Sequence, residues 1–112
     1  MSEITVIGAG NGGVTAAYHF SKLGNRVCLY DQPEFATHLN AIGEQGGIEA
    51  LSEMNEANLM LSGIEKIDKV TTDMAEAIAY SDMLVMIVPS FAQEIMFKAM
   101  LPYLTDRHVL VS

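Results

Sequence analysis

The sequence predicts a doubly wound α/β fold, with a parallel sheet in the strand order 3-2-1-4-5 and helices on both of its faces. Apolar segments of strand length alternate with segments of helical periodicity along the chain. The first apolar segment runs directly into a glycine-rich turn, and the run Met83–Val88 is unbroken, as in a central strand buried on both faces. With 112 residues, half of them hydrophobic, we expect one domain over 1–112.

The glycine-rich turn follows the first strand and has the spacing G-x-G-x-x-G. Gly8 permits a tight turn, Gly10 lets the backbone approach a pyrophosphate, and Gly13 lets the next helix pack closely on the sheet. That helix is expected over Val14–Leu23, with an apolar face formed by Ala16, Ala17, Phe20 and Leu23. It offers free N–H groups and the positive end of its dipole to phosphates. The turn therefore predicts a site for the diphosphate of a dinucleotide in a Rossmann-type domain.

An acidic residue ends the second strand. Gly24 is expected to cap the first helix in a left-handed conformation, and Arg26–Tyr30 forms the second strand. Asp31 follows, where its carboxylate can accept hydrogen bonds from both hydroxyls of an adenosine ribose. A 2′-phosphate would be repelled there, and no Lys or Arg occurs between Arg26 and Lys66. NAD is therefore favoured over NADP, whereas FAD uses the same fingerprint and stays open.

The middle of the chain is expected to supply one helix, a small β-hairpin and the third strand of the sheet. The helix covers Glu34 to Ile42, with Phe35, Leu39 and Ile42 on its inner face. The hairpin joins Ile48–Leu51 to Asn58–Leu61, and Ile67–Thr71 resumes the main sheet.

The last third of the chain carries two patterns of the capping-box type. Asp73 with Glu76 is expected to open one helix, and Ser90 with Gln93 to open the helix Phe91–Leu101. His108–Val111 then forms the fifth strand. The turn Val88–Pro89–Ser90 falls at the same sheet edge as the glycine-rich turn, so we expect it to face a bound cofactor.

Composition excludes several classes of site. The net charge of −8 is spread along the chain, which argues against a nucleic-acid surface. A lone cysteine, Cys28, excludes disulfide frameworks and is expected to be a buried hydrophobe. The histidines, at 19, 38 and 108, lack metal-ligand spacing, so no metal site is predicted. Five methionines are expected to pack in the core: Met60, Met83, Met86, Met96 and Met100.

Location is predicted from the apolar segments. The longest of them, Met83–Pro89, is much shorter than the ~20 residues that span a bilayer. The first strand begins by residue 4, which leaves no room for a signal peptide. We therefore expect a cytoplasmic protein.

The chain resembles the N-terminal domain of the opine dehydrogenases, the octopine and nopaline dehydrogenase group. The resemblance is carried by Ile7–Gly13, Gly46-Gly47-Ile48, Val70–Asp73 with Ala77, and Ser81-Asp82 with Val88-Pro89. Asn11-Gly12-Gly13 is its most specific part. Glycerol-3-phosphate dehydrogenase and ketopantoate reductase share the layout more distantly.

The resemblance implies NADH-linked hydride transfer to an imine formed from an amino acid and a 2-oxo acid. By the same likeness the cofactor would be held at the glycine turn, the end of the second strand and the turn after the fourth. These residues are Gly8, Ala9, Gly10, Asn11, Gly12, Gly13, Asp31, Gln32, Val88, Pro89 and Ser90. Relatives of this type continue into a helical domain that carries the catalytic residues. We therefore assign no residue of this chain as catalytic.

Two hypotheses follow from these expectations. In the first, the chain is the cofactor-binding half of an opine-type dehydrogenase, which binds NAD without completing turnover by itself. In the second, it is a stand-alone protein that binds or senses a dinucleotide. Within the enzyme class, the cofactor domain of an enzyme like glycerol-3-phosphate dehydrogenase or ketopantoate reductase is the alternative to the opine type. We expect either docking to a catalytic domain or self-association as a homo-oligomer, because the outer edge beside the fifth strand would otherwise be exposed.

Overall fold

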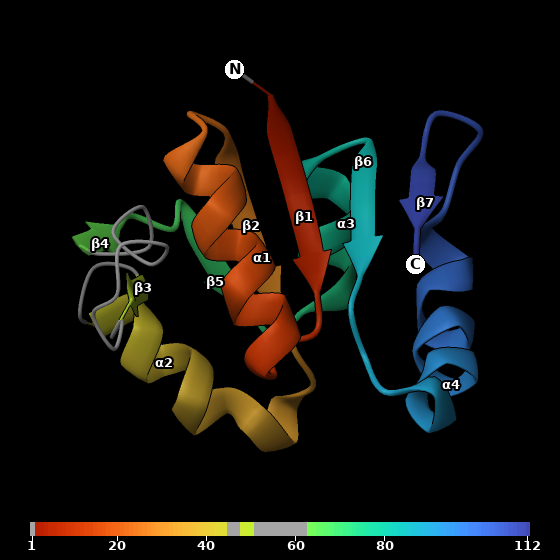
Figure 1. Cartoon of the computed structure of the whole chain (residues 1–112). Coiled ribbons are helices and arrows are strands. Elements are labelled where there is room, and N and C mark those ends of the chain that lie inside the picture. Colours follow the sequence, from red (N-terminus) through yellow and green to blue (C-terminus); the bar gives the residue numbers. More distant parts are fainter. Residues whose placement is uncertain (1, 45–47, 51–62) are drawn as a thin grey trace.

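A computed structural model describes residues 2–44, 48–50 and 63–112 of the chain. Its core is a parallel sheet of five strands in the order β5-β2-β1-β6-β7 (Figure 1). The strands are β1 (Glu3–Ile7), β2 (Arg26–Tyr30), β5 (Lys69–Thr71), β6 (Met83–Met86) and β7 (Val109–Val111). The predicted strand order 3-2-1-4-5 is confirmed.

Four α-helices of the described chain cover the two faces of this sheet (Figure 1). Their bounds are α1 (Asn11–Lys22), α2 (Ala36–Glu44), α3 (Met74–Tyr80) and α4 (Ser90–Met100). A 3-10 turn, Pro33–Phe35, precedes α2, and another, Leu101–Tyr103, follows α4. Side chains of α1 and α2 share one hydrophobic cluster, and those of α3 and α4 share the other.

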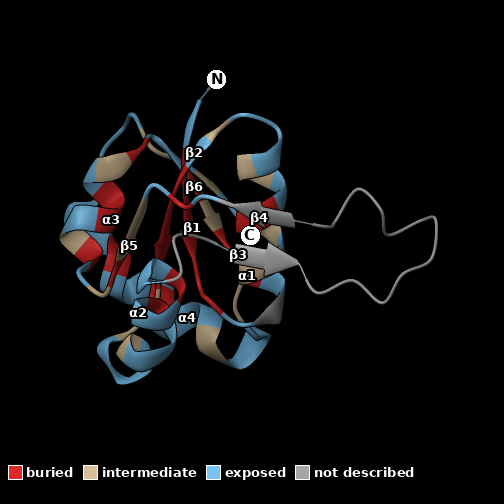
Figure 2. Ribbon diagram, turned by 90° about the vertical axis from the view of Figure 1, so that its left-hand side faces the viewer, coloured by how far each residue is buried: buried red, intermediate tan, exposed pale blue. Residues whose placement is uncertain are grey.

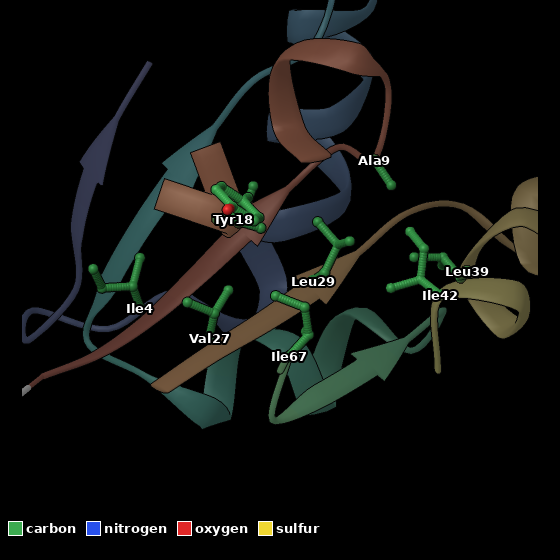
Figure 3. Packing of buried hydrophobic residues seen from close by; sticks show 10 residues of the cluster. Ile4, Ala9, Tyr18, Val27, Leu29, Leu39, Ile42 and Ile67 are labelled. Carbon is green, nitrogen blue, oxygen red and sulfur yellow. The ribbon is translucent and has the colours of Figure 1, made fainter. Parts of the chain in front are cut away.

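The central strands contribute side chains to both clusters, because successive side chains of a strand point to opposite faces. Ile4 and Val6 of β1 belong to the same cluster as Tyr18 of α1, whereas Ile7 belongs to the cluster of α3 and α4. Figure 3 shows Ile4 and Tyr18 in the first cluster. Thr5 is fully buried, and its hydroxyl donates to the carbonyl oxygen of Ala77 at 2.8 Å. Figure 2 shows the resulting distribution, with buried strands between helices whose outer sides are exposed. The continuous apolar pattern therefore reflects burial on both faces.

The register brings the carboxyl ends of three strands to one edge of the sheet. Ile7 lies opposite Tyr30 on one side and Met86 on the other. The amide of Gly8 donates to the Tyr30 carbonyl at 2.8 Å, and the amide of Ile87 donates to the Ile7 carbonyl at 2.8 Å. The residues that follow β1, β2 and β6 therefore meet at a single place.

The inserted hairpin is present in part. β3 (Ile48–Ala50) pairs antiparallel with β4 (Gly63–Glu65), before the chain enters β5. The predicted strand Asn58–Leu61 lies outside the described residues, and β5 begins at Lys69, two residues later than predicted. The predicted hairpin insertion before the third strand of the sheet is thus confirmed, with β4 as the described partner of β3.

Several packing expectations for the first two helices are wrong. α1 begins at Asn11, three residues before its predicted start, because Gly12 and Gly13 already adopt helical geometry. Leu23 is its C-cap and is 79% exposed, so it does not pack on the sheet. Phe35 is 49% exposed, because the chain enters α2 through a 3-10 turn that rotates it off the face shared by Leu39 and Ile42.

The two capping boxes differ from their predicted form. At α3 the Asp73 carboxylate accepts from the amides of Ala75 and Glu76 at 2.9 and 3.4 Å, so the predicted cap is confirmed. The Glu76 carboxylate does not complete the box, because it binds Lys69 Nζ at 2.7 Å. At α4 the prediction is wrong: the N-cap is Pro89, and Ser90 is already the first helical residue, with no side-chain cap.

Removal of the α3 cap gives a direct stability prediction. Asp73→Ala is expected to lower the free energy of unfolding by about 1 kcal/mol, because two amides of the first turn lose their acceptor. Urea unfolding followed by circular dichroism measures it. Asp106→Ala, which removes an exposed acid in a turn, is the matched control and is expected to change stability by less than about 0.5 kcal/mol.

The sulfur-containing residues behave largely as predicted. Met86, Met96 and Met100 are buried, whereas Met83 is 39% exposed at the start of β6, and Met60 lies outside the described residues. Cys28 is fully buried, and this burial raises the pKa of its thiol to about 12. It is therefore an unreactive core residue. Within the described ranges, no helix has the length and apolar character needed to cross a membrane.

Candidate functional site

The turn between β1 and α1 requires glycine at its first and last motif positions. Gly8 has φ +110°, and a Cβ there would lie 2.3 Å from the carbonyl oxygen of Ile87. A Cβ on Gly13 would lie only 1.7 Å from the carbonyl oxygen of Gly8. The roles expected for these two glycines, a tight turn and close packing of helix on strand, are thus visible in the protein's own contacts.

Gly10 differs from both of them. Its φ is −72°, which any residue can adopt, and a Cβ placed on it would meet no heavy atom of the described chain within 4 Å. It is also exposed and serves as the N-cap of α1, where no side-chain cap is present. The structure therefore leaves open space and an uncapped helix N-terminus at the position where a phosphate would approach the backbone.

Asp31 lies directly beside this turn, at the end of β2. Its Oδ2 accepts from the amide of Ala9 at 2.9 Å, and its Oδ1 accepts from the amide of Gln32 at 2.7 Å. The carboxylate is only half-buried, so each oxygen keeps a lone pair that can accept from a further donor. Two backbone amides thus hold the carboxylate at the edge where the ribose of a dinucleotide would lie.

His38 reaches the same turn from α2. Its Nε2 lies 2.9 Å from the carbonyl oxygen of Ala9, so Nε2 carries a hydrogen and donates it. The ring is otherwise exposed. Ala9 is therefore bonded at its amide by Asp31 and at its carbonyl by His38.

These groups line a cleft of about 510 Å³ at the carboxyl edge of the sheet. One wall comes from the glycine turn, a second from the end of β2 and the start of α2, and a third from the chain between β6 and α4. Its lining residues are Gly8, Ala9, Gly10, Asp31, Gln32, Phe35, His38, Ile87, Val88, Pro89, Phe91, Ala92 and Met96. None of these is Lys or Arg, so among the described lining residues Asp31 carries the fixed charge.

Two basic side chains of the strands β2 and β5 are engaged elsewhere. Arg26 opens β2, at the opposite end of the strand from Asp31, where it pairs with Asp68 at 3.1 Å and Glu3 at 3.7 Å. Asp68, hydrogen-bonded by Tyr80 and facing Arg26, has a lowered pKa. Lys69 pairs with Glu76 at 2.7 Å. No cation of the described chain faces the carboxylate that ends β2.

Most of the predicted site residues come together at the cleft. Those that line it are Gly8, Ala9, Gly10, Asp31, Gln32, Val88 and Pro89. Gly12, Gly13 and Ser90 are not among the described lining residues, and the side chain of Asn11 lies outside what the structure describes. Gly13 acts through the protein's own packing, because a Cβ there would meet the carbonyl oxygen of Gly8.

Sequence reasoning missed two side chains of this cleft. Phe35 is predicted to face the core, and His38 is given no role beyond its lack of metal-ligand spacing, yet both line the cleft beside Asp31. Their spacing of three residues, immediately after Asp31, places them on one side of the entry to α2. That proximity in sequence to the carboxylate was the available signal.

Comparisons with known proteins show which proteins this chain is similar to. The family described as NAD-dependent glycerol-3-phosphate dehydrogenase N-terminus matches residues 3–112. A glycerol-3-phosphate dehydrogenase (NAD(P)+) of Bacillus subtilis (strain 168) is 26% identical over 113 aligned positions, which cover 99% of this chain and 30% of the relative. An enzyme of the same name from Thermoanaerobacter sp. (strain X514) is 30% identical over 92 positions, covering 80% of this chain and 24% of the relative.

Solved structures give the same fold. An octopine dehydrogenase with NADH and pyruvate superposes with a TM-score of 0.75 at 23% identity, over 98% of this chain and 28% of that one. Glycerol-3-phosphate dehydrogenase from Coxiella burnetii gives 0.72 at 20% identity, over 97% and 31%. The chain thus spans about 30% of the length of the Bacillus subtilis relative.

Proposed function

The chain belongs to the family of NAD-dependent glycerol-3-phosphate dehydrogenase N-terminal domains, and we propose that it binds NAD as the cofactor half of a hydride-transferring dehydrogenase. One observation carries the proposal. Gly10 faces open space beside an uncapped helix N-terminus, so no contact within the described protein requires glycine at this position. A group that approaches the backbone from outside, such as a diphosphate, supplies the reason.

The residues of the cleft fit a dinucleotide. The first turn of α1 supplies amides for the diphosphate, and Asp31 supplies acceptors for the ribose hydroxyls. Val88 and Pro89, after β6, flank the cofactor on the far side of the glycine turn. When bound, the nicotinamide supplies or accepts a hydride, and this chain's own part is to hold and orient the cofactor.

The charges of the cleft favour NAD over NADP. A 2′-phosphate would lie close to the Asp31 carboxylate, and none of the described lining residues is a Lys or Arg that could balance it. Arg26 and Lys69 form ion pairs with other acids. FAD shares the fingerprint, but the NAD-dependent family favours a nicotinamide cofactor.

We propose reduction of an imine, formed from an amino acid and a 2-oxo acid, as one candidate reaction, because the run Ile7–Gly13 resembles opine dehydrogenases. Oxidation of glycerol 3-phosphate is the other, because the family and both curated relatives carry that name. The substrate would be selected by residues beyond those in this chain. Assay of both reactions with a polypeptide that includes a second domain separates the two candidates.

We also propose that such a second domain packs against an apolar face of this one. The face is formed by exposed side chains of α4 and the turn after it. Its members are Phe91, Ile95, Phe97, Leu101 and Tyr103. Without a second domain, self-association of the chain through this face is the alternative.

The cofactor proposal is tested by titration of the chain with NADH and NADPH, followed by nucleotide fluorescence. We expect saturable binding of NADH and at least about tenfold weaker binding of NADPH, because the second cofactor places a phosphate against Asp31. Flavin adenine dinucleotide serves as a third ligand. Equal affinity for NADH and NADPH would contradict the assignment of Asp31, and no binding of any nucleotide would contradict the function.

A further inference from the structure

Both peptide groups that flank Ala9 are held by side chains from other elements of the fold. The peptide before Ala9 donates its N–H to Asp31 Oδ2 at 2.9 Å, and the peptide after it accepts at its oxygen from His38 Nε2 at 2.9 Å. Because a peptide is planar, fixing the Ala9 carbonyl also fixes the direction of the Gly10 N–H. Ala9 is 1% exposed, so the turn is held immediately before the position that a phosphate would approach.

His38 itself is not needed to anchor α2. Leu39 and Ile42, which are 1% and 6% exposed, pack that helix onto the sheet. His38 lies on the outer side of the helix, exposed except where its ring meets Ala9 and the cleft. A side chain with little packing but one directed bond to the glycine turn acts on the turn's conformation and contributes little to the stability of the core.

We propose that His38 is a cofactor-positioning residue, which holds the Ala9–Gly10 peptide in the orientation that receives the adenosine-diphosphate part of a dinucleotide. This inference rests on the proposed function. The hydrogen bond orders the turn before the ligand arrives, so less conformational entropy is lost on binding. His38 and Asp31 both bind Ala9, and Asp31 is the residue proposed to bind the adenosine ribose. Loss of the His38 bond should therefore weaken binding of the adenosine half of the cofactor.

The test compares His38→Ala, His38→Gln and Asn40→Ala, with NADH and ADP-ribose as ligands in isothermal titration calorimetry. His38→Ala is expected to raise Kd for both ligands by about three- to tenfold, the effect of one hydrogen bond. His38→Gln is expected to restore Kd to within about twofold, because its amide nitrogen lies the same number of bonds from the backbone and can donate. Asn40, exposed on α2 and outside the cleft lining, is the matched control.

A second measurement separates positioning from a structural role. Urea unfolding of His38→Ala is expected to match that of the unaltered chain, because the residue adds little to the core. Affinity equal to that of the unaltered chain, a glutamine variant as weak as the alanine variant, or a loss of affinity that follows a loss of stability would each overturn the inference. Failure of the unaltered chain to bind either ligand would instead contradict the proposed function.

Discussion

Gly13→Ala is expected to destabilise the domain by at least about 3 kcal/mol, the upper end of the usual overpacking cost. The new Cβ would lie 1.7 Å from the carbonyl oxygen of Gly8, which is backbone and cannot rotate away. Relief requires separation of α1 from the end of β1, where Ala17 and Tyr18 of this helix help form the core. Because domains are stable by only about 5 to 15 kcal/mol, urea unfolding should detect the loss readily.

Gly10→Ala is the matched control for this prediction. The same methyl group would enter open space at a φ of −72°, so the free energy of unfolding should change by less than about 1 kcal/mol. NADH binding, in contrast, should weaken by at least about tenfold, because the methyl occupies the space of the diphosphate. Equal stability of the two variants would contradict the packing role of Gly13, and unchanged NADH affinity of Gly10→Ala would contradict the diphosphate site.

Asp31→Ala has the largest effect expected on cofactor choice. It removes the acceptor for the ribose hydroxyls and for the Ala9 and Gln32 amides, so NADH binding should weaken by about 1.5 to 3 kcal/mol. NADPH binding should weaken less, because the repulsion of its 2′-phosphate disappears as well. The ratio of the dissociation constant of NADPH to that of NADH, measured by fluorescence titration, should therefore decrease toward one.

Glu34→Ala is the control for the change in net charge. Glu34 is an exposed acid three residues further on, outside the cleft lining, and its removal should leave both dissociation constants within about twofold. If Glu34→Ala weakens NADH binding as much as Asp31→Ala does, the loss of affinity comes from the change in net charge, and the assignment of Asp31 to the ribose is wrong.

The fold was largely predictable because its signals are local and periodic. A glycine turn marks the end of β1 and an acid marks the end of β2, and burial on both faces explains the apolar run that begins at Met83. The errors fall at element ends. Phe35 and Leu23 have apolar side chains at helical spacing, yet a 3-10 turn and a C-cap position turn both toward solvent, which periodicity alone does not encode.

The candidate site was predictable at positions where the structure tolerates one residue type for a clear physical reason. Gly8 and Gly13 follow from steric contacts that admit no Cβ, and Asp31 follows from its place at the end of β2. The bond of His38 to Ala9 joins residues 29 positions apart, and it depends on the angle at which α2 leaves the sheet edge. At Ser90 a local pattern gave a wrong prediction. Pro89 occupies the N-cap position of α4, so Ser90 lies inside the helix and its side chain forms no cap.

The most direct test of the account is a titration of the ¹⁵N-labelled chain with NADH, followed through its backbone amide resonances. The largest shifts are predicted at the amides of residues 9–13 and at Asp31 and Gln32, with smaller shifts after β6 near Val88. Saturation that moves only amides elsewhere, for example those around Tyr103 and His108 on the far side of α3, would contradict the placement of a dinucleotide at the glycine turn.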